Sequence, residues 1–253
     1  MRSRFVVAAI SALLGSSSLA AAQAQGKFPP DSLINTKVFP RTTPVSDVVG
    51  AMRNFTGALG VRCQFCHVGA EGQPLSQYDF ASDEKRNKLV ARQMMRMVAE
   101  INARLDTIPQ RPASPVTASC MTCHRGVSRP VPLYTLVQEA AVAVNADSAI
   151  SAYKILRNRY YGRDAFDFSE SALNTAAFRT ARAGKVDDAL KLLRYNEDLF
   201  PNSSGMSVFK GNILLMKGDT AGAESAFREA LKRDSTNNEA RGRLQAIGKK
   251  GSP

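Results

Sequence analysis

The chain has 253 residues, with 34 lysines and arginines against 22 aspartates and glutamates, so its formal net charge is +12. A basic exterior favours an acidic protein partner, an anionic membrane surface or nucleic acid, and the export signal described next argues against nucleic acid. Beyond residue 26 the sequence has no run of eighteen or more apolar residues, so the mature chain is predicted to be soluble, with peripheral membrane association through its basic surface left open.

The first 25 residues are predicted to be a secretory signal peptide. Arg2 and Arg4 form a positive n-region, residues 5–14 form an apolar stretch, and the alanine-rich run at 20–24 offers small-residue cleavage sites. A membrane anchor is the alternative, but the apolar run is short for a span and serines at 16–18 interrupt it. We therefore expect a periplasmic protein whose mature chain begins near residue 26.

The mature chain begins with an extended lead-in and a helix. Residues 27–44 hold four prolines and no sustained period, which is typical of a loop. Ser46 is a candidate N-cap, apolar residues then recur at helical spacing as far as Leu59, and Gly60 fits a C-terminal cap. This predicted helix leads directly to Cys63.

Two pentapeptides carry the chemistry, CQFCH at 63–67 and CMTCH at 120–124. Each is a C-x-x-C-H signature of covalent haem attachment. The spacing suits this reaction because two thiols must reach the two vinyl groups of one porphyrin, and the next imidazole must reach the iron. The predicted thioether residues are Cys63, Cys66, Cys120 and Cys123, and the predicted iron ligands are His67 and His124.

The two pentapeptides use all four cysteines and both histidines of the chain. A zinc site is one alternative, since paired cysteines commonly hold tetrahedral zinc, but zinc gives no reason for a histidine directly after each pair. A disulfide framework is a second alternative in an exported chain, and it would leave the histidines without a role. The pattern therefore predicts two covalently bound haems c.

A second helix is predicted between the two pentapeptides. Ser82 is a candidate N-cap, with Asp83 and Glu84 in the first turn, and the helix is expected to continue to about Leu105. Its apolar side comprises Val90, Met94, Met97, Val98, Ile101 and Leu105, and its opposite, basic side comprises Lys85, Lys88, Arg92 and Arg96. Prolines at 109, 112 and 115 prevent its continuation and indicate a loop to Cys120.

The sixth ligand of each iron is predicted to be methionine, because both histidines are already used and Met/His ligation is common in electron-transfer cytochromes. Met52 is the candidate on the first helix. On the second helix Met94 and Met97 lie one turn apart on the same side, and spacing alone does not separate them. Met95 lies on the basic side, and Met121 lies inside the attachment loop. Core filling is the alternative role for any of these methionines.

The sequence resembles the photosynthetic reaction-centre cytochrome c subunit family over roughly residues 35 to 135. The matching stretches are Leu59–His67, Phe80–Asp83, Ala91–Met97 with Ile101 and Asn102, and Cys120–Gly126. The resemblance implies that each haem lies against a helix that donates its distal methionine, which pairs Met52 with His67 and Met94 with His124. Reaction-centre subunits carry four haems, and here no further attachment motif and no third histidine exist. The chain therefore resembles a two-haem relative of this family rather than a cytochrome subunit of a reaction centre.

The second half of the chain is predicted to consist of helical repeats. Gly184 recurs as Gly218, Ala189 as Ala223 and Leu193 as Phe227, which is the period of 34 residues found in tetratricopeptide helix pairs. The predicted pairs are 174–200 and 207–232, with further helices around 146–160 and 238–247. Two pairs fall short of the usual three. The repeats are either a docking surface for a partner or a stabilising appendage, and Asp164, Asp167 and Glu170 are expected to be solvated loop charges.

The sequence thus predicts an all-α protein with few strands, made of a signal peptide (1–25), a di-haem cytochrome c domain (26–135) and a tetratricopeptide-like domain (136–253). The predicted function is transfer of single electrons between exported or membrane-bound redox proteins, with the repeats docking a partner. A di-haem peroxidase with one open iron is the alternative, and an assembly scaffold is a third. The enzyme needs an exchangeable distal position, which is incompatible with Met94 as a ligand.

Overall fold

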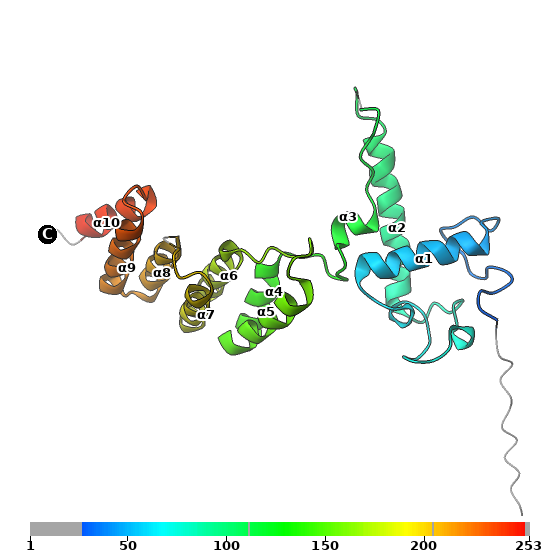
Figure 1. Ribbon diagram of the computed structural model, residues 1–253, viewed down its shortest axis with the longest axis horizontal. Helices are drawn as coiled ribbons and strands as arrows, with labels where there is room; N and C mark the ends of the chain where they lie inside the picture. The colour runs from blue at the N-terminus through cyan, green and yellow to red at the C-terminus, as the bar shows by residue number, and fades with distance from the viewer. Residues whose placement is uncertain (1–26, 111, 204, 251–253) are drawn as a thin grey trace, which may run out of the picture. The chain divides into compact units, whose positions relative to one another are not determined.

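The computed structural model describes residues 27–110, 112–203 and 205–250, so the predicted signal peptide lies outside the described residues. Within these residues the fold is all-helical, which confirms the predicted class (Figure 1). Extended pairing in the same residues amounts to an isolated bridge between Val68 and Asp79. None of the helices in these residues combines the length and the apolar character needed to cross a membrane.

The described helices follow one another with short connections. Their bounds are α1 (Val45–Leu59), η1 (Cys63–Phe65), η2 (Leu75–Gln77), α2 (Arg86–Leu105), α3 (Cys120–His124), α4 (Leu133–Ala143), α5 (Ala146–Tyr160), α6 (Glu170–Arg182), α7 (Val186–Leu199), α8 (Gly205–Lys217), α9 (Thr220–Arg233) and α10 (Asn238–Lys250). The chain divides into two compact units, Met1–Val49 with Gln64–Arg92, and Gly50–Cys63 with Gln93–Pro253. The domain boundaries predicted at residues 25 and 135 stay predictions.

Helix α1 begins and ends close to its predicted bounds. Its first turn is closed by the Pro44 carbonyl, which accepts from Asp47 N at 3.1 Å, so Ser46 lies inside the helix rather than at its cap. At the other end Gly60 adopts φ +65°, and Val61 N donates to Thr56 O at 3.1 Å. A left-handed glycine with this hydrogen bond is the usual way to end a helix, so the predicted C-terminal cap is confirmed.

Helix α2 ends at Leu105 as predicted but begins at Arg86, several residues after the predicted Ser82 cap. The Ser82 hydroxyl accepts only from Glu84 N, at 3.2 Å, which makes a local turn. The Asp83 carboxylate is directed to Arg92 Nη1 at 2.9 Å instead of to the helix N-terminus. The predicted N-cap at Ser82 is wrong because the side chains of Lys88 and Arg92 hold residues 80–83 in a loop.

Helices α4 to α9 form three antiparallel pairs, and α10 packs on α9. The sequence predicted two of these pairs, with flanking helices around 146–160 and 238–247, so α4 was missed as the partner of α5. Ala149 and Tyr153 of α5 are fully buried at the positions that Ala189 and Leu193 occupy in α7 and that Ala223 and Phe227 occupy in α9. The first interval is 40 residues and the second is 34, because the segment 161–169 lengthens the connection between the first two pairs. The longer interval concealed the first repeat.

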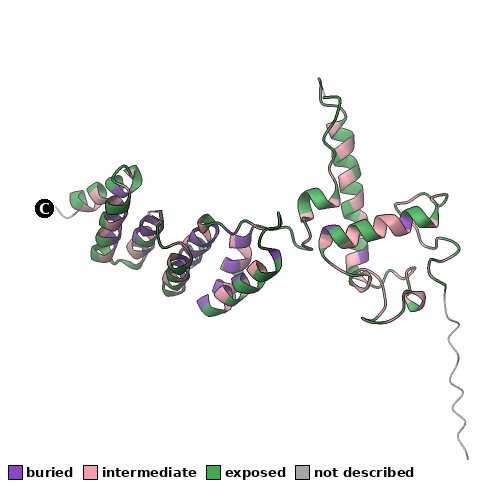
Figure 2. Cartoon of the chain, viewed as in Figure 1, coloured by how far each residue is buried: buried purple, intermediate pink, exposed green. Residues whose placement is uncertain are grey.

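The helix pairs contain the apolar core of the described chain (Figure 2). A first cluster runs from Val127 through α4 to α8, and a second joins α8, α9 and α10. Gly184 and Gly218, which have φ of +86° and +83°, end α6 and α8 in the same way. In contrast, the buried residues among those described between 27 and 126 are Val48, Ala58 and Lys88. The haem-signature region therefore has almost no apolar core made of its own side chains.

Candidate functional site

The first pentapeptide begins in η1, a single 3-10 turn that follows α1 after a three-residue connection. Two side chains at the start of α2 hold its backbone: Lys85 Nζ donates to Gln64 O at 3.1 Å, and Asn87 Nδ2 donates to Phe65 O at 3.1 Å. Carbonyl groups in a short loop need such partners when helices cover them. The segment that leads to Cys66 and His67 is thus fixed from one side by helix α2.

His67 lies half-buried against an aromatic cluster. Its ring meets Phe80 edge-on at 4.9 Å between centroids, and Phe80 in turn contacts Tyr78 at 5.7 Å and Phe28 at 5.4 Å. Burial, followed by the nearby positive charge of Lys88, lowers the pKa of His67 to about 4. The imidazole is therefore neutral at physiological pH, which is the form that binds a metal. Its Nδ1 is buried and has no hydrogen-bond partner in the described structure.

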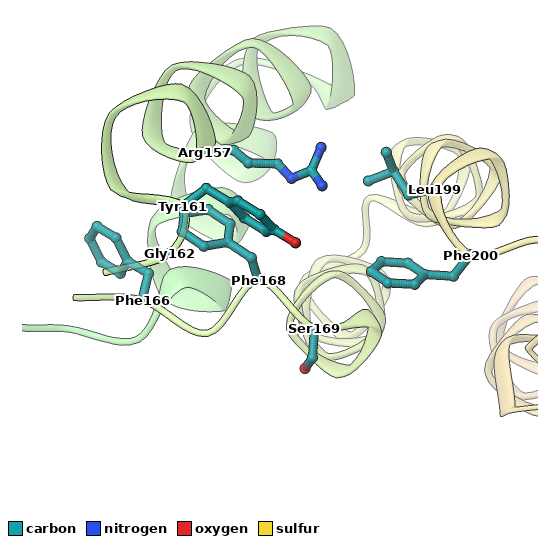
Figure 3. Close-up of a pocket in the computed structure, with 8 residues that line it drawn as sticks. All are labelled: Arg157, Tyr161, Gly162, Phe166, Phe168, Ser169, Leu199 and Phe200. Atoms are coloured by element: carbon teal, nitrogen blue, oxygen red, sulfur yellow. The ribbon is translucent and has the colours of Figure 1, made fainter. Parts of the chain in front are cut away.

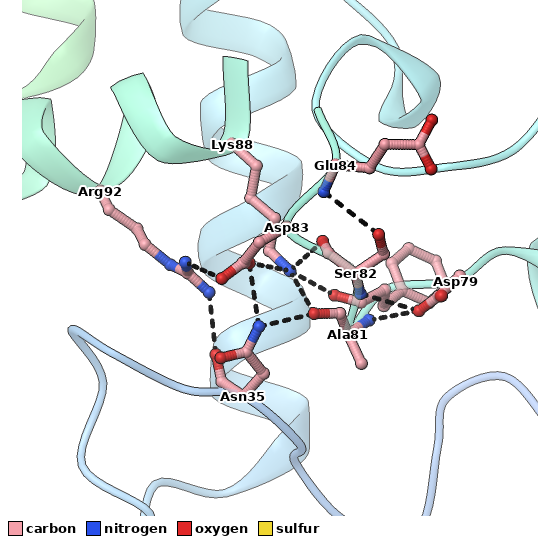
Figure 4. A network of polar contacts seen from close by, with 9 residues as sticks. Asn35, Asp79, Ala81, Ser82, Asp83, Glu84, Lys88 and Arg92 are labelled. Carbon is pink, nitrogen blue, oxygen red and sulfur yellow. Dashed lines mark hydrogen bonds and ion pairs between the residues drawn. The ribbon is translucent and has the colours of Figure 1, made fainter. Parts of the chain in front are cut away.

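A polar network holds the loop that carries Phe80 (Figure 4). Lys88 Nζ donates to the carbonyls of Phe80 at 2.9 Å, Ala81 at 3.0 Å and Ser82 at 2.7 Å, and pairs with Asp83 Oδ1 at 3.1 Å. Lys88, which the sequence places on the basic side of the helix, is one of the buried residues. A buried ammonium group is tolerated because every donor has an acceptor.

Asp83 completes this network. Its carboxylate accepts from Arg92 Nη1 at 2.9 Å and from Asn35 Nδ2 at 2.9 Å, and Arg92 Nη2 also donates to Asn35 O at 2.9 Å. The Arg92 hydrogen bond is the main reason that the pKa of Asp83 lies far below its ordinary value. Arg92 and Lys88 therefore act inside the fold, and together with Asp83 they position the backbone on which Phe80 rests against His67.

The second pentapeptide is the short helix α3. Ser119 caps it, accepting from Thr122 N at 3.3 Å while Ser119 N donates to Thr122 Oγ1 at 2.9 Å. Asn102 of α2 bridges to the residue before this cap: its Nδ2 donates to Ala118 O at 2.9 Å and its Oδ1 accepts from Ala118 N at 2.7 Å. Reciprocal caps of this kind stabilise helix ends. Cys120 and Cys123 are thereby presented one turn apart on a helix that is fixed to α2.

His124 ends α3 with one ring nitrogen already engaged. Its Nδ1 lies 2.9 Å from Val127 O, a carbonyl that can only accept, so Nδ1 carries the proton and Nε2 has the lone pair that can coordinate a metal. Metal-binding histidines usually have such a second partner, which fixes their tautomer and orientation. Val127 is buried in the apolar core of the helix pairs. The imidazole of the second motif is therefore oriented by the first residue of that core.

The chain after His124 contacts the end of α1. Arg125 and Gly126 have φ of +49° and +88°, which turns the chain sharply, and Gly126 N donates to Ala58 O at 2.8 Å. A Cβ atom on Gly60 would lie 2.0 Å from Gly126 O. Only glycine at position 60 permits this approach. The residues just before Cys63 and just after His124 are thus joined through their backbones.

The candidate methionines differ in burial. Met94 and Met97 are 39% and 44% exposed, and Ile101 on the same side is 36% exposed. Met52 and Met95 are half-buried. The apolar side of α2 is thus open at these positions, whereas Lys88 on its basic side is buried and Arg92 is half-buried. The assignments of Met52 to the first iron and of Met94 to the second stay predictions.

These residues fit covalently bound haem. All four cysteines lie in the described residues as thiols rather than disulfides, so the disulfide framework is wrong for this structure. An open apolar side of α2 that carries two methionine side chains, and a region with almost no core of its own, suit a large flat apolar group. No group of three or more His, Cys, Asp or Glu side chains gathers as a metal site in the described part of the chain.

Several positioning residues had only partial signals in the sequence. The motif S-x-x-T at Ser119 is a weak capping-box signal, and Asn102 stood within a stretch that resembled the family, but neither revealed the bond to residue 118. Glu170 was expected to be a solvated loop charge, which is wrong. Its Oε1 accepts from Asn174 Nδ2 at 3.0 Å and from Ser203 Oγ, in a polar network inside the helix pairs. Asp164 and Asp167 are exposed as expected.

Comparison with known proteins places this geometry in context. Residues 47–166 match the family model described as photosynthetic reaction centre cytochrome C subunit. Cytochrome c-554 of Chloroflexus aurantiacus is 40% identical over 70 residues, which make up 27% of this chain and 14% of that protein. The chain therefore covers only a small part of this relative's length. The family match includes both pentapeptides and extends through α4 and α5, beyond the predicted end of the haem domain.

Proposed function

Residues 47–166 carry a domain of the photosynthetic reaction centre cytochrome C subunit family, and from this premise we propose that the chain is an exported c-type cytochrome with two covalent haems c. Its role is to carry single electrons between exported or membrane-bound redox proteins. The family supports the cytochrome character and the electron-transfer role, and the two C-x-x-C-H motifs support the number of haems. The alanine-rich leader supports a periplasmic location.

One observation carries the proposal most directly. His124 Nδ1 is held by Val127 O at 2.9 Å, one turn after two thiols on the same short helix. This leaves Nε2 for an iron and the two Sγ atoms for one porphyrin edge. A haem supplies a reversible one-electron couple, and its axial ligands and their hydrogen bonds tune the potential. The hydrogen bond to Val127 makes the imidazole a stronger donor to the metal.

The protein's own residues have three tasks in this function. The thiols of each pentapeptide bind the cofactor, and each histidine coordinates from one side. Met52 and Met94 are proposed as the opposite ligands, which favours a higher potential than bis-histidine ligation. Phe80 and the loop held by Lys88 exclude water from the imidazole of His67. Limited access of water and rigidly held ligands keep the reorganisation energy of electron transfer small.

We propose that the helix pairs α4 to α9 are tetratricopeptide-like repeats that dock a partner protein. Their equivalent buried positions and the repeated glycine ends of α6 and α8 support the repeat character. The basic exterior favours an acidic redox partner or the surface of an anionic membrane. Val127 belongs to the core of these helix pairs, and its carbonyl also accepts the hydrogen bond of His124. A partner docked on the helix pairs would therefore bind the same folded unit that carries the second motif.

The test is a measurement of cofactor number and ligation on the exported protein. The full-length gene is expressed with a c-type cytochrome maturation system, and the intact mass and the reduced absorption spectrum are recorded. We expect the mass of the mature polypeptide plus two haems, and low-spin spectra for both. Cys66→Ala and Cys123→Ala are matched variants that should each lose one haem. A colourless wild type of polypeptide mass overturns the proposal, and a high-spin signal from one haem favours the peroxidase-like alternative.

A further inference from the structure

A cavity in the helix pairs is lined by none of the haem-signature residues and is not used by the proposed function. Its volume is about 340 Å³. Its walls come from the end of α5, the segment 161–169 and the end of α7; the lining side chains are those of Arg157, Tyr161, Phe166, Phe168, Leu199 and Phe200. Figure 3 shows Arg157 and Tyr161 facing Leu199 and Phe200 across the cavity. The volume lies at the lower end of the range for small-molecule sites.

The cavity holds one positive charge that the protein does not neutralise. The Arg157 guanidinium lies over the Tyr161 ring at 4.7 Å, and its Nε is buried with no hydrogen-bond partner. Among the described residues the Arg157 side chain forms no ion pair. A guanidinium that is partly desolvated and stacked on an aromatic ring attracts an anion, and a carboxylate fits its planar donor geometry. The terminal nitrogens are the atoms that such an anion would meet.

Two further polar side chains beside the cavity bind each other, and the Tyr161 hydroxyl points into the space in Figure 3. Asp167, which separates Phe166 from Phe168, accepts from Ser169 N at 2.8 Å and from Ser169 Oγ at 2.9 Å. Ser169 itself points away from the cavity in Figure 3. The remaining walls are aromatic or aliphatic, and Phe168 is buried. Aromatic walls favour a ring in offset or edge-on contact.

We propose that this cavity binds a small aromatic monocarboxylate, with the ring between Phe168 and Phe200 and the carboxylate on the terminal nitrogens of Arg157. The single charge selects a monoanion, and the volume admits one ring with a short substituent. The same chemistry occurs at the carboxyl terminus of a polypeptide that ends in phenylalanine. The small acid is favoured because the lining offers no second charged group for a peptide backbone or a neighbouring side chain.

Calorimetric titration of the haem-loaded full chain tests the proposal. Benzoate and phenylacetate should bind in a saturable manner with one site per chain, and benzamide, the neutral isostere, should bind about tenfold or more weakly. Arg157→Gln should weaken benzoate binding by a similar factor. Arg159→Gln is the matched control, since Arg159 is exposed and lies over the Tyr160 ring instead; it should leave the affinity unchanged.

A second variant keeps the test decisive if Arg157→Gln does not fold. Leu199→Phe fills the cavity and keeps the charge, so it should abolish binding while the reduced haem spectrum stays that of the wild type. Equal affinity for benzoate and benzamide overturns the proposal, as does full binding by Leu199→Phe. A peptide ending in phenylalanine that binds more than tenfold tighter than N-acetylphenylalanine also overturns it, and assigns the cavity to a protein partner.

Discussion

Replacing Gly60 by alanine tests how the end of α1 and the chain after His124 are joined. Two costs add at this position. Gly60 has φ +65°, where a residue with a Cβ is disfavoured by about 1–2 kcal/mol. The new Cβ would also stand 2.0 Å from Gly126 O, a backbone atom that cannot turn aside. The two segments must then separate and lose the Gly126 N to Ala58 O hydrogen bond, which contributes about 1 kcal/mol.

We therefore expect Gly60→Ala to lower the free energy of unfolding by about 2–3 kcal/mol. Two matched glycines separate the causes. Gly126 has φ +88° and open space around a new Cβ, so Gly126→Ala should lose only about 1–2 kcal/mol. Gly57 lies exposed inside α1 with nothing near a new Cβ, so Gly57→Ala should gain about 0.5–1 kcal/mol.

The assay is denaturant unfolding of the haem-loaded protein, followed by circular dichroism and by haem absorbance. The predicted order of midpoints is Gly57→Ala, wild type, Gly126→Ala and Gly60→Ala, from highest to lowest. If Gly60→Ala unfolds no earlier than Gly126→Ala, the close backbone approach is not present in the folded protein. If the unfolding midpoint of Gly57→Ala lies below that of the wild type, the gain expected from the higher helix propensity of alanine is refuted instead.

The remaining predictions concern the iron ligands and pH. Met52→Ala should keep two attached haems but make one high-spin and lower its potential; an unchanged spectrum in redox titration refutes the assignment. Met94→Ala should change the other haem in the same way, whereas Met97→Ala should leave both spectra as they are, and the opposite result exchanges the two roles. Asp83→Asn should destabilise the protein at neutral pH, with a difference from the wild type that shrinks as the pH falls below about 4. The sign follows because the pKa of Asp83 is lowered in the folded state, so the unfolded chain binds its proton first and acid removes the carboxylate's contribution. Glu84→Gln, which alters an exposed neighbouring carboxylate, is the matched control in thermal unfolding.

The sequence predicted those features that depend on local spacing. The end of α1 at Gly60 and the end of α2 at Leu105 were predicted correctly, because each is determined by a few adjacent residues. The start of α2 was not, since the Lys88 ammonium group binds three carbonyls of the preceding loop. Such contacts join residues that are brought together by the tertiary fold, and the hydrophobic periodicity of the sequence does not report them.

The basic side of α2 shows the same limit in another way. Helical periodicity separated an apolar side from a basic side, and the usual inference is that the apolar side faces the core. Here Lys88 is buried and Met94 and Met97 are exposed. The usual inference assumes that protein covers every apolar face. In a region whose apolar partner is a cofactor, the lysine and arginine side chains instead pack against the protein loop.

The position of Val127 changes the interpretation of the helix pairs. An appendage would share no structural element with the second pentapeptide, but Val127 lies three residues after His124 and belongs to the core of α4 to α8. Its carbonyl fixes the imidazole, and Arg125 Nη1 lies 3.4 Å from Asp164 O in the segment between the first two pairs. The family match also continues through α5 to residue 166. The first helix pair is therefore part of the structure that orients His124, and the repeats extend from it, so motion within that pair would act directly on the His124 imidazole.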